Sequence, residues 1–212
     1  VEIVRSYQHC FDLKYGCNPH QAEAAIFSPG DAPLPFKVLN GRPGYINLLD
    51  ALNAWQLVHE LDEVFEMPAA ASFKHVSPAG AALGVPLDTK LEEVYNCGEM
   101  PRTPLTDAYI RARGADPLCS FGDFIALSRE VDPETAEVIR GQVSDGIIAP
   151  AYSGEALKTL KQKKKGGFIV LQADPEFVPE AEYYREVHGV VFRQHRGIVR
   201  LDEKSLLEKL VT

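Results

Sequence analysis

Lys74 and His75 stand side by side at the end of a short run of small and apolar residues, 69–73. An imidazole titrates near neutral pH and can move protons, and a neighbouring ammonium can stabilise developing negative charge. The run predicts a strand that presents the pair at its end, followed by a turn at 77–80 and a helix from about Ser77. Taken alone, the dipeptide is better explained as a surface charge beside a hydrogen-bonded histidine, because functional groups are the minority.

A second group of polar residues surrounds the turn signal Asn18-Pro19. The segment 14–21 offers a cation at Lys14, a phenol at Tyr15 and amide donors, a combination that suits a phosphate or a carboxylate. A plain solvated loop explains the same composition.

A third candidate is the bend at 120–123, where Gly122 lets the backbone approach a ligand closely. Its alternative explanation is a loop that simply precedes a strand.

The composition narrows the class of protein. The chain has 212 residues, enough for one large domain or two small ones, and its net charge of −8 argues against a general nucleic-acid binder. Four separated cysteines favour reduced thiols in a cytosolic protein, and no apolar run is long enough to span a membrane. The chain lacks a signal-peptide pattern and a starting methionine, so we expect it to be processed or excised from something longer.

The elements that position these residues can be read from the periodicity of the sequence. Residues 36–40 predict a strand, and a helix is expected from Asn47, with Asp50 completing an N-cap pattern. An apolar stripe at helical spacing predicts core packing for this helix. Its members are Leu48, Leu52, Trp55, Val58, Leu61 and Phe65.

From residue 124 onwards strands and helices alternate. Strands are predicted at 124–127, 146–149 and 168–171, and the helices between them are capped by Asp132 and Ser153. Short connections of this kind indicate strand–helix–strand units and a largely parallel sheet covered by helices.

Three further features lie towards the end of the chain. The lysine-rich run 161–165 suggests nucleic acid, but the helix dipole and solvation explain it better. Strands are expected at 189–192 and 197–201, and a final amphipathic turn begins at Asp202 or Glu203.

Several of these stretches together resemble the phosphoribosylaminoimidazolecarboxamide formyltransferase family, the AICAR transformylases of purine biosynthesis. The resemblance runs from about residue 11 to residue 212. Its motifs are Lys-Tyr-Gly-x-Asn-Pro-His-Gln (14–21), Val-Leu-Asn-Gly-x-Pro-Gly (38–44), Ala-Ser-Phe-Lys-His-Val-Ser-Pro-Ala-Gly-Ala-Ala (71–82), Arg-Ala-Arg-Gly-Ala-Asp (111–116), Ser-Phe-Gly-Asp-Phe (120–124) and Val-Ser-Asp-Gly-Ile-Ile-Ala-Pro (143–150).

The resemblance implies a cytidine-deaminase-like α/β three-layer sandwich with a mostly parallel sheet and no zinc. The sequence lacks the His-x-Glu and Pro-Cys-x-x-Cys signature of zinc deaminases. The implied reaction moves a formyl group from the co-substrate 10-formyltetrahydrofolate to the 5-amino group of AICAR, with no metal, in the cytoplasm.

The motifs also imply roles for particular residues. Lys74 and His75 match the catalytic pair of the family. The positions that hold the nucleotide phosphate match Lys14 and Tyr15, and other positions around the nucleotide match Asn40, Gly122 and Asp145.

The resemblance further implies that residues 1–212 form the first of two transformylase lobes, without the second lobe or the IMP cyclohydrolase domain that often precedes the first. Family members act as homodimers, so we expect self-association. Three interpretations remain: the enzyme or its nucleotide-binding half, a binding or regulatory module that holds AICAR without turnover, and an unrelated α/β structural domain.

Overall fold

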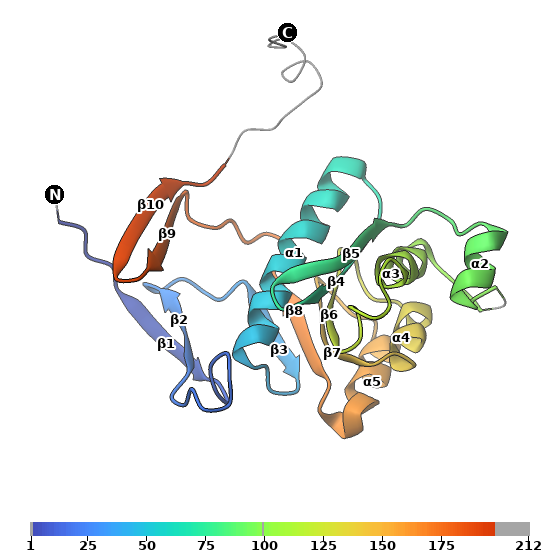
Figure 1. Ribbon diagram of the computed structural model, residues 1–212, viewed down its shortest axis with the longest axis horizontal. Coiled ribbons are helices and arrows are strands. Elements are labelled where there is room, and N and C mark those ends of the chain that lie inside the picture. The colour runs from blue at the N-terminus through green and yellow to red at the C-terminus, as the bar shows by residue number, and fades with distance from the viewer. Residues whose placement is uncertain (1, 99, 198–212) are drawn as a thin grey trace, which may run out of the picture. The chain divides into compact units, whose positions relative to one another are not determined.

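The computed structural model describes residues 2–98 and 100–197. The chain divides into two compact units, Val1–Pro175 and Glu176–Thr212 (Figure 1). The first unit contains β1 (Tyr7–Asp12), β2 (Ala25–Pro29), β3 (Phe36–Asn40), α1 (Tyr45–Phe65), β4 (Ala69–Lys74), β5 (Ser77–Leu83), α2 (Thr89–Tyr95), α3 (Pro104–Gly114), β6 (Asp123–Leu127), α4 (Pro133–Arg140), β7 (Ser144–Ala149), α5 (Gly154–Gln162), the 3-10 turn η1 (Lys163–Gly166) and β8 (Ile169–Ala173).

The central sheet has six strands in the order β3-β8-β7-β6-β4-β5. Only the β8–β7 and β7–β6 pairings are parallel, and the three others are antiparallel. The prediction of a mostly parallel sheet was therefore wrong. The parallel part runs from β6 to β8, with a helix between successive strands. The antiparallel strands β4 and β5 extend it on one side and β3 extends it on the other.

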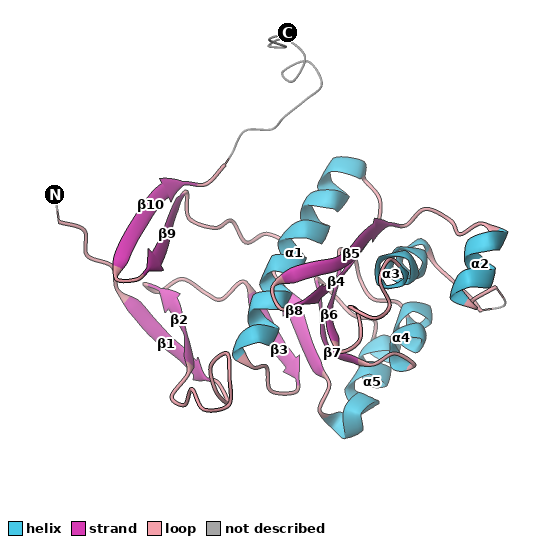
Figure 2. Cartoon of the chain, viewed as in Figure 1, coloured by secondary structure: helices cyan, strands magenta, loops and turns pink. Residues whose placement is uncertain are grey.

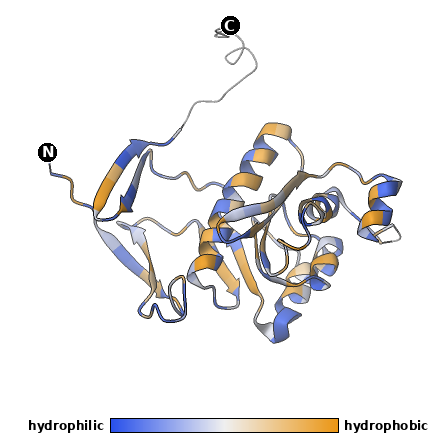
Figure 3. Ribbon diagram, viewed as in Figure 1, coloured by the Kyte–Doolittle hydropathy of each residue, from blue (hydrophilic) through white to orange (hydrophobic). Residues whose placement is uncertain are grey.

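Helices cover both faces of this sheet, which makes three layers (Figure 2). Side chains alternate along β4, so Ala69, Ala71 and Phe73 belong to the core beneath α1, whereas Ala70 belongs to the core beneath α3, α4 and α5. A strand that is covered on both faces is largely apolar, and Figure 3 shows mostly hydrophobic colouring along β8. The expected α/β sandwich is confirmed at this level of detail.

Local capping confirms two predicted helix starts and corrects a third. Asp132 accepts a hydrogen bond from the amide of Thr135 at 2.7 Å, and Ser153 accepts one from Ala156 at 3.2 Å. Helix α1, however, begins at Tyr45, with Gly44 as its N-cap. Asn47 lies one turn inside the helix and accepts a hydrogen bond from the Gly44 amide at 3.0 Å, so it completes the cap from the third position.

The helix expected from Ser77 is a strand. Residues 77–83 form β5, which pairs with β4 in an antiparallel hairpin at the edge of the sheet, where Pro78 is tolerated. A Cβ at Gly80 would lie 2.1 Å from the carbonyl oxygen of Ala112, so glycine is required where α3 packs directly on this strand. Small residues therefore serve close packing here rather than a helix start.

Several elements were not predicted from the sequence. They include α3 and the β1–β2 hairpin, which joins the core through Leu13, Phe11 and Ile26. In the second unit β9 (Glu182–Val187) pairs with β10 (Val190–His195), which confirms the strand expected at 189–192. The strand expected at 197–201 and the final amphipathic turn lie outside the described residues, apart from Gly197. No helix in the described part of the chain has the length and apolar character of a membrane span.

Candidate functional site

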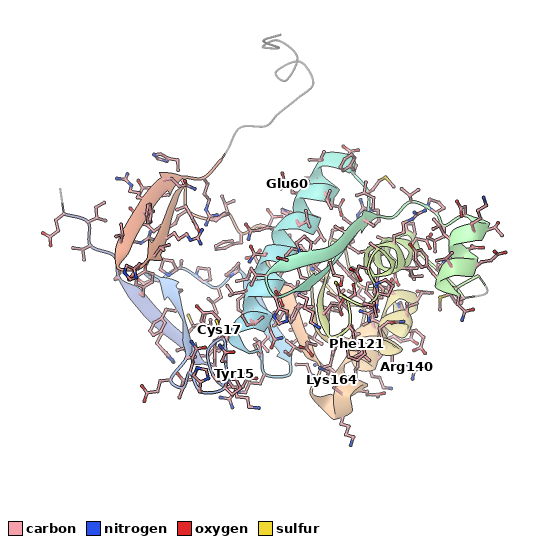
Figure 4. The ribbon with its side chains drawn as sticks, in the orientation of Figure 1. Tyr15, Cys17, Glu60, Phe121, Arg140 and Lys164 are labelled. Carbon is pink, nitrogen blue, oxygen red and sulfur yellow. The ribbon has the colours of Figure 1, made fainter. Side chains whose placement is uncertain are left out.

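Most of the candidate residues lie at one end of the strands of the central sheet. This sheet edge is the line of strand ends and not the edge strand β5. The strands β3 and β4 end at this edge, and β6, β7 and β8 begin there, because Asn40 pairs with Val170, Phe73 with Phe124 and Gly146 with Ile169. Phe121 and Lys164 mark this edge in Figure 4. Ligands of open parallel sheets usually lie beyond the carboxyl ends of the strands. Here the reversed strands β3 and β4 bring their carboxyl ends to the amino ends of the parallel strands.

Lys74 and His75 occupy the tip of the β4–β5 hairpin. Lys74 is the last residue of β4 and pairs with Ser77, so only His75 and Val76 form the turn. Both turn residues have positive φ, 52° and 65°, as in a type I′ hairpin turn. Lys74 is half-buried and His75 is exposed, so the strand holds one group while the turn presents the other to solvent.

The ammonium of Lys74 is held by the neighbouring bend. Its Nζ donates a hydrogen bond to the carbonyl oxygen of Phe121. Gly122 follows with φ +75°, and a Cβ built there would lie 3.7 Å from Lys74 Nζ. The predicted bend at 120–123 and the predicted pair at 74–75 therefore meet.

A buried polar network beneath the bend fixes its shape. Asp123 is fully buried, accepts a hydrogen bond from Ser72 at 2.6 Å and pairs with Arg113 at 2.9 Å. The Arg113 guanidinium also donates to the Ser120 carbonyl at 2.7 Å and to the Gln142 side chain at 3.0 Å. Burial raises the pKa of Asp123, although hydrogen bonding by Ser72 and the charge of Arg113 oppose that rise. One guanidinium thus ties the loop before β6 to the loop before β7.

Asp145 lies at the start of β7 and forms an ion pair with Lys164 at 2.5 Å. Both side chains are partly exposed, at 46% and 41%, so water screens this pair and a ligand can reach either partner. Neighbouring Lys163 donates a hydrogen bond to the Gln142 carbonyl, and burial lowers its pKa. The lysine run is therefore only partly explained by solvation, because two of its members bind groups at this edge.

Asn40 joins the end of β3 to the start of β8. Its side-chain amide donates to the carbonyl oxygens of Gly166 at 3.0 Å and Phe168 at 2.7 Å. These bonds use the amide hydrogens and leave the side-chain oxygen as the atom that can accept a hydrogen bond from a ligand.

Lys14 and Tyr15 lie in the loop between β1 and β2, where Figure 4 labels Tyr15. The ammonium of Lys14 lies 5.7 Å from the centre of the Tyr15 ring, and Lys14 is exposed. Asn18 and Gln21 close this loop by hydrogen bonds to each other. Within residues 2–98 and 100–197, no hydrogen bond or ion pair joins Lys14 or Tyr15 to the residues at the sheet edge.

Two residues that contribute to this edge were not identified from the sequence. Asp50 was interpreted as part of a helix cap, yet it is 5% exposed on α1 and accepts a hydrogen bond from the Val76 amide at 2.5 Å. Its spacing from buried Ala54 and Val58 places it on the buried face of the helix, and that was the available signal. Arg113 lies in the motif 111–116, but nothing in the motif shows which groups it contacts.

The sheet edge combines a cation, an imidazole and a carboxylate with the bend at Phe121 and Gly122. Such a group can position an anionic or amide-bearing ligand, move a proton and stabilise an oxyanion. Among residues 2–98 and 100–197, no three or more histidine, cysteine or acidic side chains are grouped so that they would hold a metal ion.

Comparison with known proteins gives a consistent match. The family model described as AICARFT/IMPCHase bienzyme matches residues 2–212. The chain is 34% identical over 213 residues to the bifunctional purine biosynthesis protein PurH of Clostridium botulinum strain Loch Maree, and 31% identical to that of strain Hall. These alignments cover 99% of this chain but 38% of each relative, so the chain spans about two fifths of the length of the proteins it matches.

Proposed function

Since the chain belongs to the AICARFT/IMPCHase bienzyme family, we propose that it is the nucleotide-binding lobe of an AICAR transformylase. The complete enzyme would move a formyl group from 10-formyltetrahydrofolate to the 5-amino group of AICAR. The observation that carries this proposal is the meeting of Lys74 and His75 with the bend at Phe121 and Gly122. We also propose that the three-layer fold is cytidine-deaminase-like and binds its ligands without zinc.

The chemistry requires a proton acceptor, because the AICAR amine is a weak nucleophile. Its nitrogen attacks the formyl carbon and loses a proton, and we assign the acceptance of that proton to His75, which is exposed at the hairpin tip. The bond between the formyl carbon and the folate nitrogen then breaks, and that nitrogen gains a proton. Lys74 would stabilise the intermediate oxyanion and supply this proton.

The nucleotide would be held by the surrounding residues. We assign the phosphate to Lys14 and Tyr15, and the base and ribose to Asn40, Gly122 and Asp145. Asn40 offers its side-chain oxygen, whereas Asp145 would exchange its bond with Lys164 for one to the ligand. The family further suggests a homodimer that works in the cytoplasm.

A second candidate function is a module that binds AICAR but does not turn it over. This candidate is favoured because the alignment covers only 38% of the relatives. A chain that carries part of a site binds a ligand more readily than it catalyses the reaction. In this alternative the second lobe supplies the folate pocket and is absent from residues 1–212.

Calorimetric titration of this chain with AICAR, beside a formyl-transfer assay, distinguishes the candidates. Binding with turnover supports the enzyme, and binding without turnover supports the isolated lobe or module. A folded sample that shows no AICAR binding would contradict both and would overturn the assignment of the site.

A further inference from the structure

The hairpin tip that carries His75 has a backbone conformation unfavourable for its sequence. The two turn residues, His75 and Val76, both lie in the left-handed region. Type I′ turns normally contain asparagine, aspartate or glycine, because these residues tolerate positive φ. Valine is branched at Cβ and is rare there. Something outside the hairpin must therefore stabilise this turn.

Asp50 provides that stabilisation from the buried face of α1. Its Oδ1 accepts a hydrogen bond from the Val76 amide at 2.5 Å, and Val76 is the second residue of the turn. Leu48, Ala51 and Ala54 are buried on the same helix, so Asp50 lies where an apolar residue would otherwise be expected. A buried carboxylate costs free energy unless a donor satisfies it, and here the turn supplies the backbone amide of Val76 as that donor.

We propose that Asp50 is a positioning residue of the site. It holds the left-handed His75-Val76 turn and thereby sets the direction of the His75 imidazole and the end of β4 at Lys74. This inference rests on the proposed function, because it treats His75 and Lys74 as the reacting pair.

The charges around Asp50 agree with this role. His75 and Asp145 are the charged or titratable side chains that act on it most strongly, the first favouring the carboxylate and the second opposing it. Burial raises the pKa of Asp50, and the hydrogen bond from the Val76 amide and the charge of His75 oppose that rise. The turn and the carboxylate therefore stabilise each other.

A double-mutant cycle tests the proposal. Asp50→Ala removes the acceptor, and Val76→Gly relieves the left-handed strain, since glycine populates positive φ readily. The turn also positions Lys74 against the bend at Gly122, which we assign to the nucleotide. If Asp50 acts by holding the turn, Asp50→Ala should therefore weaken AICAR binding by about tenfold or more in the parent chain but by only about threefold in the Val76→Gly background. Binding is measured by calorimetry on the full 212-residue chain.

Asp62→Ala is the matched control. Asp62 lies on the same helix and is also hydrogen-bonded, but to Ser128 and Arg129 rather than to the turn. Its loss should have the same effect on AICAR binding in both backgrounds. Equal losses for Asp50→Ala in both backgrounds would overturn the proposal and leave Asp50 as a core residue.

Amide hydrogen exchange at Val76 reads the turn without any ligand. Exchange should become about tenfold faster or more in Asp50→Ala, with intermediate behaviour in Asp50→Asn, which keeps one acceptor oxygen but loses the charge. An unchanged exchange rate would refute the support of the turn by Asp50. If exchange at Val76 speeds up in Asp50→Ala as expected but the parent chain does not bind AICAR, the proposed function fails while the contact that holds the turn stands.

Discussion

At the scale of single residues, the site places its ionisable groups in different environments. Lys74 is half-buried and bonded to a carbonyl oxygen, whereas His75 is exposed at the turn. Neither side chain belongs to a core cluster of the described residues. Substitution of either residue should therefore affect the chemistry much more than the stability of the fold.

We expect Lys74→Ala and His75→Ala to lower formyl transfer by about 100-fold or more in a chain as long as the curated relatives, because each removes a proton-transfer or charge-stabilising group. The free energy of unfolding should change by no more than about 1 kcal/mol, since both residues lie outside the core. Steady-state assays and urea unfolding measure the two effects. Near-normal turnover in either variant would show that its assigned catalytic role is wrong.

Lys14 should contribute to affinity through the phosphate alone. Lys14→Ala should weaken AICAR binding by about tenfold, because one charged hydrogen bond is lost, whereas Lys14→Arg should retain it. The nucleoside without its phosphate should bind both variants and the parent chain equally. A matching loss for the nucleoside would place Lys14 elsewhere in the site.

At the scale of elements, the loops at the sheet edge are held by buried polar groups rather than by apolar packing. Arg113 reaches from α3 to Ser120, Asp123 and Gln142, which lie in or beside two different loops. The amide of Gly122 also donates a hydrogen bond to the Val143 carbonyl at 2.9 Å. This bond joins the same two loops directly. The shape of the bend thus depends on this network.

Asp123→Asn should lower the free energy of unfolding by about 3 kcal/mol, because it leaves the Arg113 charge without its buried partner. AICAR affinity should fall as well, since the bend loses its anchor. Urea unfolding and calorimetry report the two quantities. Glu137→Gln, which removes an exposed ion pair with Arg140, is the control and should leave both almost unchanged; an equally small effect of Asp123→Asn would contradict the role of the network.

The end of α1 should respond to acid through Asp62. Burial alone would raise the pKa of Asp62, but hydrogen bonds from Arg129 and Ser128 outweigh it and hold the pKa below the ordinary value of 3.8. Stability from this carboxylate is therefore present above pH 3.8 and is lost as the pH falls through the lower, folded-state pKa.

Asp62→Asn should flatten this acid dependence and cost about 1 kcal/mol at neutral pH, a small value because Arg129 is half-exposed. Unfolding measured between neutral pH and acid checks both effects. An unchanged slope on the acid side would mean that other carboxylates dominate.

At the scale of the whole molecule, the central sheet and its helices form a unit without the second one. The core clusters of the described residues contain nothing beyond Ala173, and the unit boundary follows at Pro175. The β9–β10 hairpin exposes Val190, Val191 and Phe192, so it has little core of its own.

Deletion of residues 176–212 should leave the first unit folded, because its core is complete without them. We expect cooperative thermal unfolding with a midpoint within about 5 °C of the full chain. Circular dichroism and AICAR titration of the shortened chain check this expectation. Loss of cooperative unfolding would show that the second unit contributes to the stability of the first.

The sequence by itself determined the alternation from residue 124 onwards, the caps at Asp132 and Ser153 and the apolar strand before Lys74. These features depend on local rules, because side-chain periodicity and capping act over a few residues. The motifs also named both Lys74 and Gly122 as candidates, and these two residues lie next to each other in the structure.

Only the tertiary structure decided the strand order, the hairpin at His75-Val76 and the parts played by Asp50 and Arg113. The His-Val turn carries no local turn signal, and its positive φ values are accompanied by a hydrogen bond from Val76 to the Asp50 carboxylate, far away in the chain. The direction of β3 and β4 depends on pairing between distant strands. Such contacts are set by packing across the sheet, so no local pattern of residues could have revealed them.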